Sequence, residues 1–238
     1  EQEYHFKVLR IALAKLGYTW AEGLYHLSYG MVELPHGKMK SREGTVVDAD
    51  ELIEMMEDDA RALAEERGMI ADMSDEQKST LYHQVAMAAL KYFILKVDPK
   101  KKMMFNPAES IDLQGNTGPF IQYTFARISS MLRKAGIANQ LPETNAPELL
   151  HEKEKQLIKH LHQFPATINE AGTAYNPAIV AQYVYDLAKT YNQFYDACPV
   201  MKAESDALKN FRLTLSATVA RTIREALALL GIDVPEKM

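Results

Sequence analysis

Apolar residues recur at helical spacing along most of this chain, and the spacing changes in one place. Residues 2–16 carry the helical period, and Gly17 follows as a typical stop. Between Tyr25 and Leu34 apolar residues alternate with small or polar ones, which is typical of a strand. A polar loop, 38–44, comes next. This helix–strand–loop order indicates the closing piece of an α/β sheet whose earlier strands are absent.

Every later segment is predicted to be helical, because start and stop signals bracket each apolar repeat. The starts carry capping boxes or an early proline, and glycine or proline marks most of the ends. The expected helices run from Asp48 to Gly68, Ser74 to about Val97, Pro119 to Gly136, Pro147 to about His162, Asn176 to about Ala197 and Glu204 to Gly231, with a short one at Pro165. No strand is expected after residue 48. The fold class is therefore mainly α, with an all-helical bundle over 71–238.

The composition limits the class of protein and the cellular compartment to be expected. The chain has 238 residues, 47% hydrophobic and 25% charged, which is an ordinary globular balance. Its one cysteine, Cys198, allows neither an internal disulfide nor a cysteine zinc site, so we expect a reducing compartment. Apolar runs are too short to cross a membrane, and no secretory signal is present. The chain begins without Met inside a predicted helix, and we interpret it as a piece of a longer protein.

Charge is unevenly distributed. The formal net charge of −5 argues against a nucleic-acid partner. From Asp48 to Glu76, however, twelve acidic residues and two arginines give −10, whereas from Lys91 to Lys134 eight basic and three acidic residues give +5. A local basic surface could therefore meet phosphate while the rest does not. Charge alone favours the simpler interpretation that both stretches are solvated faces.

Two groups of residues could carry chemistry. The loop Gly37–Gly44 holds three cations and a hydroxyl between glycines, a composition that can close over a polyphosphate. By composition alone a solvated basic turn explains it better. Several tyrosines cluster on or before one predicted helix; most should be core, and one or two could stack on unpaired bases: Tyr175, Tyr183, Tyr185, Tyr191 and Tyr195. His160 and His162 are two residues apart and do not share a helix face, so we expect no metal site.

Three separated stretches together resemble bacterial arginyl-tRNA synthetases, and they occur in that family's order. His26–Val32 running into Gly37–Gly44 looks like the last catalytic strand and the Lys-Met-Ser-Lys-Ser loop of class I synthetases. Gly115–Arg127 resembles the family's Gly-Asp-Thr-Gly-Pro-Tyr-x-Gln-Tyr-x-x-x-Arg helix start. The final Leu229–Met238 is similar to the family's usual ending.

The resemblance implies that the chain contains parts of two domains with different functions. Residues 1–70 would be the end of a Rossmann-like catalytic domain, and 71–238 a helical anticodon-binding domain. The full enzyme would use ATP, with Mg²⁺, to join L-arginine to its tRNA in the cytoplasm. We expect it to be a monomer. The family's His-Ile-Gly-His type motif is missing, so the chain alone is expected to be inactive.

The resemblance also assigns site residues. The loop would bind ATP and stabilise pyrophosphate charge through Lys38, Met39, Lys40, Ser41 and Arg42. Lys40 and Ser41 depart from the usual order, which leaves Lys40 and Arg42 as alternatives for the second lysine's task. Tyr123 and Arg127, one helical turn apart, are the expected anticodon-loop contacts, together with Tyr195 and the terminal Met238.

Two other classes of function compete with this interpretation. A free-standing helical RNA-binding module would explain the bundle, but it would have no use for the strand and loop before residue 48. A protein–protein scaffold would explain the helices and would present no basic surface beside the tyrosines.

We expect Lys38→Ala or Lys40→Ala, made in the full-length enzyme, to slow adenylate formation and leave arginine binding nearly unchanged. Removing one donor that stabilises developing charge typically costs ~3 kcal/mol of barrier. ATP–pyrophosphate exchange measures the first step directly. Wild-type exchange in both variants would show that the loop is misassigned.

Overall fold

The structure is a computed structural model that describes residues 2–33, 48–71, 73–137, 141–145 and 147–238. In chain order its elements are helix α1 (Gln2–Lys15), the 3₁₀ helix η1 (Thr19–Gly23), strand β1 (Val32–Glu33), α2 (Ala49–Glu66), α3 (Asp75–Leu95), strand β2 (Met103–Met104), α4 (Pro107–Ser110), α5 (Gly118–Lys134), α6 (Glu152–Ala174), α7 (Pro177–Ala197) and α8 (Asp206–Leu229). The prediction of a mainly helical chain is confirmed.

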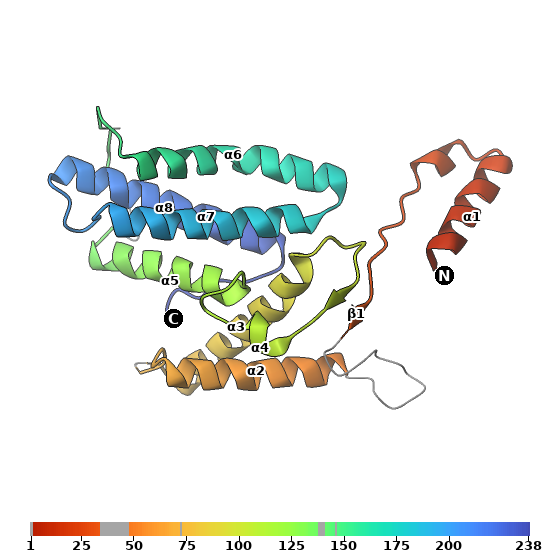
Figure 1. Cartoon of the computed structure of the whole chain (residues 1–238), viewed down its shortest axis with the longest axis horizontal. Coiled ribbons are helices and arrows are strands. Elements are labelled where there is room, and N and C mark those ends of the chain that lie inside the picture. The colour runs from red at the N-terminus through yellow and green to blue at the C-terminus, as the bar shows by residue number, and fades with distance from the viewer. Residues whose placement is uncertain (1, 34–47, 72, 138–140, 146) are drawn as a thin grey trace.

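The long helices form a layered bundle (Figure 1). Helices α5, α6, α7 and α8 lie roughly side by side, with α6 packed on α7 and α8 packed on both α5 and α7. Helix α3 crosses below them and contacts α5, and α2 packs against the other side of α3. Helix α1 stands apart from this body, and all its residues are at least partly exposed.

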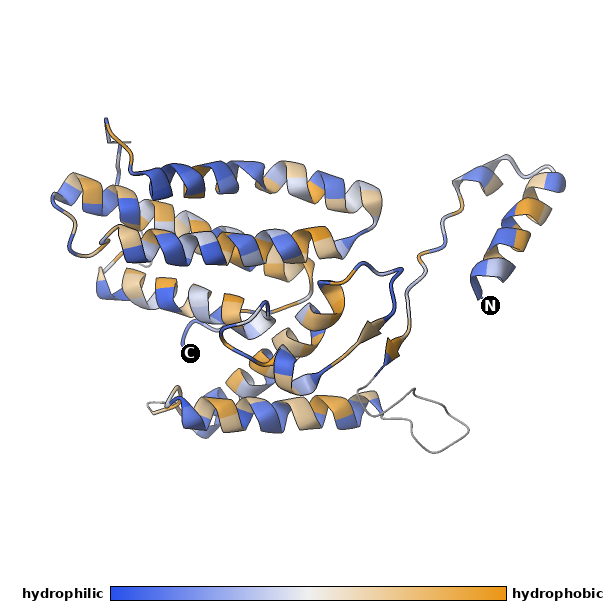
Figure 2. Ribbon diagram, in the orientation of Figure 1, coloured by the Kyte–Doolittle hydropathy of each residue, from blue (hydrophilic) through white to orange (hydrophobic). Residues whose placement is uncertain are grey.

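Helix α3 serves two hydrophobic cores, and Figure 2 shows that it is apolar over much of its length. Ala88 and Tyr92 face the large core of α5 to α8. The remaining buried residues of α3 face a smaller core built with α2 and Phe105. Since two opposite faces are covered, the helix lacks the single apolar stripe of a surface helix.

Helix α5 begins in close contact with α3. A Cβ atom at Gly118 would lie 2.3 Å from the carbonyl oxygen of Ala88, so any larger residue would push the two helices apart. Thr117 caps α5 by accepting a hydrogen bond from the Phe120 amide. The hydroxyl of Tyr92, fully buried, lies 2.6 Å from the Asn116 side-chain oxygen and 2.9 Å from the Ala181 carbonyl oxygen. The glycine-rich turn is thereby anchored on both α3 and α7.

The other end of the bundle is held by a buried ion pair. Arg212 of α8 donates from Nε to Glu154 of α6 at 2.7 Å and from Nη1 to the Pro199 carbonyl at 2.9 Å. Glu154 also accepts from the backbone N–H of His151, completing a capping box that begins α6. Each buried charge is compensated by the other, so removal of either side chain would leave an unpaired charge in the interior and destabilise the fold.

Several start and stop predictions are confirmed. Ser74 and Gln77 form the expected capping box of α3, and Asn176 caps α7 with Pro177 in the first turn. Four predicted stops after α1, α2, α5 and α8 adopt the left-handed backbone conformation that glycine accepts readily: Gly17, Gly68, Gly136 and Gly231.

Three element predictions were wrong. Of the expected strand over Tyr25–Leu34, the described residues form a strand at Val32–Glu33 alone, because only there does a neighbour, β2, supply ladder hydrogen bonds. That parallel neighbour, Met103–Met104, is itself a strand after residue 48, where none was expected. The helix expected from Pro147 to about His162 and the short helix expected at Pro165 are instead one helix, α6, which begins at Glu152 and continues through the exposed Pro165.

The N-terminal part approaches the bundle through a second glycine. The Gly30 amide donates to the Pro99 carbonyl at 2.6 Å, and a Cβ atom there would lie 2.0 Å from the Lys101 carbonyl oxygen. Tyr25 stacks on Tyr175, which ends α6, with ring centroids 4.3 Å apart. The extended segment therefore reaches both the α3–β2 connection and the α6–α7 turn.

Gly118→Ala should lower the free energy of unfolding by about 1–3 kcal/mol, because the new methyl group overpacks the α3–α5 contact. Thermal or urea unfolding of the chain measures this. Gly172→Ala is the matched control, since it lies within exposed α6 and its Cβ would meet nothing within 4 Å. That control should be neutral or stabilising by up to ~1 kcal/mol. Equal effects at both positions would contradict the close-approach explanation.

Candidate nucleic-acid interface

The predicted ATP loop cannot be placed. Lys38, Met39, Lys40, Ser41 and Arg42 all lie outside the described residues. The described residues before the loop end with β1, and those after it begin with Asp48, the N-terminal cap of α2. The loop assignment therefore stays a prediction.

Arg127 and Tyr195 are brought together from two helices. The guanidinium of Arg127, on α5, lies 4.8 Å from the ring centroid of Tyr195, on α7. Arg127 also reaches the side-chain oxygen of Asn192 at 3.5 Å, and Asn192 donates to the Thr124 hydroxyl at 3.2 Å. A cation over an aromatic face is held by the ring quadrupole. The result is an exposed cation held over an aromatic ring by contacts from two helices.

Tyr123 lies one turn before Arg127 on α5 and is 37% exposed. Residues four apart on a helix share a face, so Tyr123 extends the same side of α5. An accessible aromatic ring on the same helix face as a cation is the combination that proteins use to bind unpaired bases and their phosphates.

The tyrosine cluster separates by burial as the helical spacing suggested. Tyr183 and Tyr191 are buried in the bundle, and burial raises the pKa of both phenols. Tyr191 bonds Ser216 at 3.3 Å and lies beneath Tyr195, with ring centroids 6.2 Å apart. Tyr195 itself is partly buried at the edge of the core. Tyr195 is thus the member of this pair that Arg127 covers at the surface.

Met238 lies elsewhere. Its apolar contacts are with the smaller core of α2 and α3, whereas Tyr195 packs against the larger core. The described contacts link Arg127 with Tyr195 and include none between either residue and Met238. Its assignment to the RNA surface stays a prediction.

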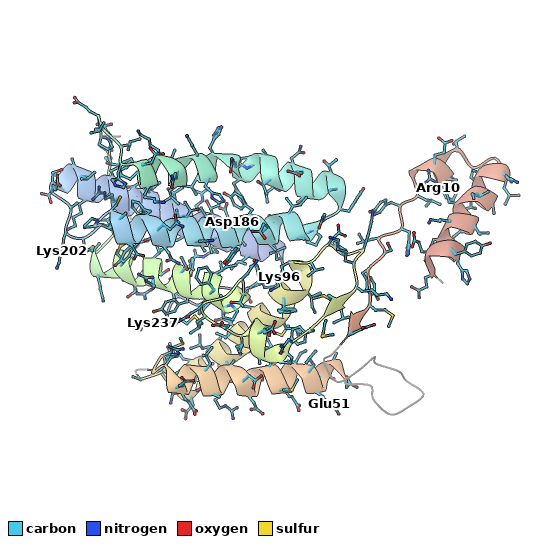
Figure 3. All side chains as sticks on the ribbon, viewed as in Figure 1. Arg10, Glu51, Lys96, Asp186, Lys202 and Lys237 are labelled. Carbon is cyan, nitrogen blue, oxygen red and sulfur yellow. The ribbon has the colours of Figure 1, made fainter. Side chains whose placement is uncertain are left out.

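The basic stretch from Lys91 to Lys134 is not one continuous surface. Lys91 donates to the Gly231 carbonyl, and Lys96 donates to the Asn116 carbonyl at 2.9 Å. Burial lowers the pKa of Lys96, whose ammonium also lies 4.2 Å from the Phe93 ring centroid. Figure 3 places Lys96 near the end of α3, inside the junction of the helices. Arg127 remains exposed on the α5 face.

Sequence reasoning missed the residues that orient this face. Asn192 links Arg127 to Thr124, and Asn116 and Lys96 secure the turn that begins α5. Gln122 is fully buried and bonds backbone on two other segments. Gln122 and Asn116 fall within the Gly115–Arg127 motif, which was the available signal; Asn192 carried none.

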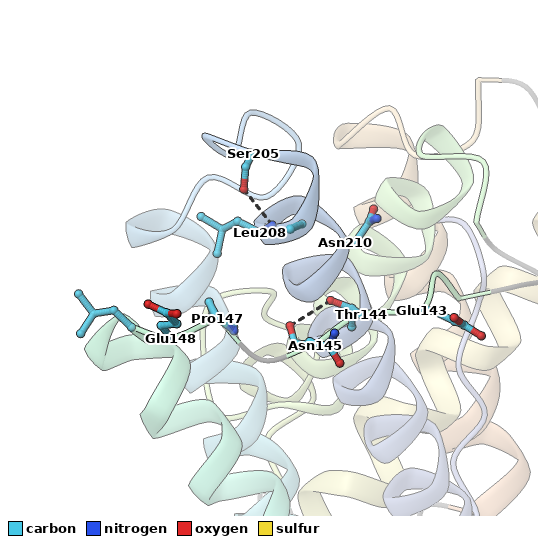
Figure 4. A pocket seen from close by; sticks show the side chains of 10 residues that line it. Glu143, Thr144, Asn145, Pro147, Glu148, Ser205, Leu208 and Asn210 are labelled. Atoms are coloured by element: carbon cyan, nitrogen blue, oxygen red, sulfur yellow. Dashed lines mark hydrogen bonds between the residues drawn. The ribbon is translucent and has the colours of Figure 1, made fainter.

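One hollow in the structure is a poor phosphate site. It lies between the start of α8 and the segment before α6, and Figure 4 shows its lining. Glu143 and Glu148 line it, and none of the described residues around it is a lysine or arginine. Ser205, also in the lining, is already used to cap α8 through the Leu208 amide. A negatively charged ligand would meet repulsion there.

The described part of the chain offers neither a cluster of metal ligands nor a membrane-spanning helix. It contains no group of three or more His, Cys, Asp or Glu side chains placed to hold a metal ion. His160 instead packs edge-on against Tyr183 between α6 and α7, and burial lowers its pKa. None of the helices described is both long and apolar enough to span a bilayer.

Comparison with known protein families divides the chain in two. Residues 1–106 match the catalytic domain of class I (R) tRNA synthetases. Residues 121–238 match the DALR anticodon binding domain. The boundary predicted at residue 70 stays a prediction.

Individual relatives match over the whole chain. It is 56% identical to an arginine–tRNA ligase of Flavobacterium psychrophilum and covers 39% of that protein, and 54% identical to one of Parabacteroides distasonis, covering 40%. The chain thus spans about two-fifths of the length of these relatives. The structure is also similar to Thermus thermophilus arginyl-tRNA synthetase, with a TM-score of 0.85 and 34% identity over 98% of this chain and 39% of that one. The chain therefore belongs to the arginyl-tRNA synthetase family.

Proposed function

We propose that this chain is the C-terminal part of an enzyme that uses ATP to attach arginine to its tRNA, and that its helical part binds the anticodon loop. The whole-chain similarity to arginine–tRNA ligases carries the first half of the proposal. The Arg127–Tyr195 pair with Tyr123 beside it carries the second, because it offers a stacking surface and a cation on one face.

In the ATP reaction the loop Lys38–Gly44 would supply cations to the developing pyrophosphate charge. No covalent link to the protein is required, since positioning and charge stabilisation suffice. Mg²⁺ would arrive with ATP. In the whole protein, further strands would pair with residues 25–31, which alternate in the strand pattern and expose Leu27, Tyr29 and Met31. We infer that the protein acts as a monomer in the cytoplasm.

Recognition of the anticodon loop would rest on stacking and local charge. Loop bases are unpaired, so aromatic rings can stack on them while polar groups read their edges. The chain as a whole is acidic, with a formal net charge of −5, so attraction to phosphate has to be local. Arg127 supplies such a charge at the ring of Tyr195.

A free-standing RNA-binding module is the weaker alternative. Residues 1–106, almost half of the chain, match a catalytic domain family, and a module that only binds RNA would have no need of them. A scaffold protein would need neither the catalytic match nor the exposed Arg127–Tyr195 surface.

We expect Tyr195→Ala and Tyr123→Ala to weaken binding of an arginine-tRNA anticodon stem-loop by ~1–3 kcal/mol, the usual contribution of a stacked base. A scrambled stem-loop should lose much less. Fluorescence anisotropy with labelled RNA measures both. Tyr29→Ala is the control, because Tyr29 is 86% exposed and lies outside the proposed face. If neither substitution distinguishes the two RNAs, the rings serve packing only and the site is wrong.

Arg127→Lys separates charge from geometry in the same assay. Lysine keeps the charge but lacks the planar guanidinium that lies over Tyr195, so affinity should fall while the salt dependence is retained. Arg127→Ala should both weaken binding and reduce the slope of affinity against salt. An unchanged slope in the alanine variant would contradict a phosphate contact at Arg127.

The 238-residue chain alone should not activate arginine, because it spans about two-fifths of its relatives and matches only part of a catalytic domain. ATP–pyrophosphate exchange with arginine and tRNA should stay at background. Exchange above background would show that the chain contains a sufficient active site.

A further inference from the structure

Gln122 is a fully buried polar side chain at the junction of three segments. Its Nε2 donates to the Gln84 carbonyl of α3 at 3.1 Å and to the Asp233 carbonyl at 2.7 Å. Both partners are acceptors, so the amide has to present its nitrogen to them; the flipped orientation would set three oxygens together. One side chain of α5 thus joins α3 to the residues after α8.

Those residues, 232–238, form a C-terminal segment without regular secondary structure that is nevertheless fastened to the bundle. Lys91 donates to the Gly231 carbonyl just before it. Arg224 and Arg133 both contact Glu236. These ion pairs are exposed, and exposed pairs contribute little to stability. The buried bonds from Gln122 are therefore the principal polar anchor of the segment.

Gln122 is a less stabilising choice for this buried position than an apolar side chain of similar size. Among the described residues, its Oε1 has no hydrogen-bond partner although it is buried. A buried acceptor without a partner is destabilising, and an apolar side chain of similar size would avoid that penalty. What an apolar residue could not do is bond the Asp233 carbonyl. Glutamine at position 122 therefore indicates that residues 232–238 have to be held in place, even at some loss of stability.

The segment packs against α5, the helix that carries Tyr123 and Arg127. Gln122 is adjacent to Tyr123 on α5, and Arg133 of the same helix contacts Glu236. Figure 3 shows Lys237 next to α5, on the side facing α2. Residues 234–237 form one wall of a groove whose other wall is the first turns of α3. Release of the segment would remove that wall and detach Met238 from the smaller core.

We propose that Gln122 is a positioning residue for RNA binding, which fixes residues 234–238 so that the end of the chain contributes to the anticodon-loop surface. This inference rests on the proposed function. Gln122 itself is buried and touches no RNA; it acts through the segment that it holds.

The first measurement is the tether itself. Gln122→Met keeps the length and bulk of the side chain and removes both donors. Timed carboxypeptidase digestion followed by mass spectrometry should release the terminal residues roughly tenfold faster in this variant, because release requires the segment to open. Ser129→Ala, another buried polar position of α5, is the control and should match wild type. Equal release in Gln122→Met and wild type would overturn the anchoring step.

The second measurement is RNA affinity, using a labelled arginine-tRNA anticodon stem-loop and the same chain. Gln122→Met and a truncation after Asp233 should each weaken binding about tenfold. In the truncated background Gln122→Met should add less than about twofold, because both changes act through one segment. A full additional loss there would show that Gln122 acts through the packing of α5, and it would overturn the proposal.

The truncation removes none of the buried core residues, although it removes Val234 and Met238, which pack against the two cores. It therefore provides a second test if Gln122→Met does not fold. Unchanged affinity on truncation overturns the positioning role by itself. If the wild-type chain binds no stem-loop, the proposed function fails and the RNA part of this inference fails with it. If wild type binds and neither variant weakens binding, the inference alone is wrong.

Discussion

The arrangement of this protein depends on the close contact between α3 and α5. Helix α3 is covered on two sides, and its Ala88 carbonyl leaves no room for a side chain at Gly118. Once α5 is seated there, Asn116 can meet the Tyr92 hydroxyl, and Gln122 can meet the Gln84 carbonyl. A single point of close packing therefore sets the register between the two cores and orients the exposed face of α5.

The same contact explains why one short motif carries so much of the structure. Thr117 caps the helix, Gly118 permits the approach, Pro119 suits the first turn, and Gln122 reaches across to the end of the chain. Each residue therefore has a different structural role, and each depends on the others for its position. Tyr123 and Arg127 then point away from the core on a helix that is already fixed at its start.

The electrostatics of the surface follow from where the cations are used. Lys91 and Lys96 bond backbone carbonyls, while Arg133 and Arg224 contact Glu236. Arg127 lies over the Tyr195 ring and contacts the side-chain oxygen of Asn192. An acidic protein can thus present a local cationic, aromatic surface, because the potential near a surface is set by the nearest exposed charges within about 8–10 Å at physiological salt. The acidic α2 lies on the far side of α3 from the larger core and does not cancel this surface by contact.

Local sequence patterns were sufficient to predict the helical class, the helix stops at Gly17, Gly68, Gly136 and Gly231, and the capping at Ser74 and Asn176. These features are local: they depend on backbone conformation and on side chains within a few residues. The packing of the folded chain, by contrast, sets three contacts that no local pattern predicts: Val32–Glu33 pairs with Met103–Met104, Arg127 covers Tyr195, and Gln122 bonds the Asp233 carbonyl. These contacts join residues far apart in the chain. Helical period shows which residues share a face, whereas the partner of that face depends on how the helices pack.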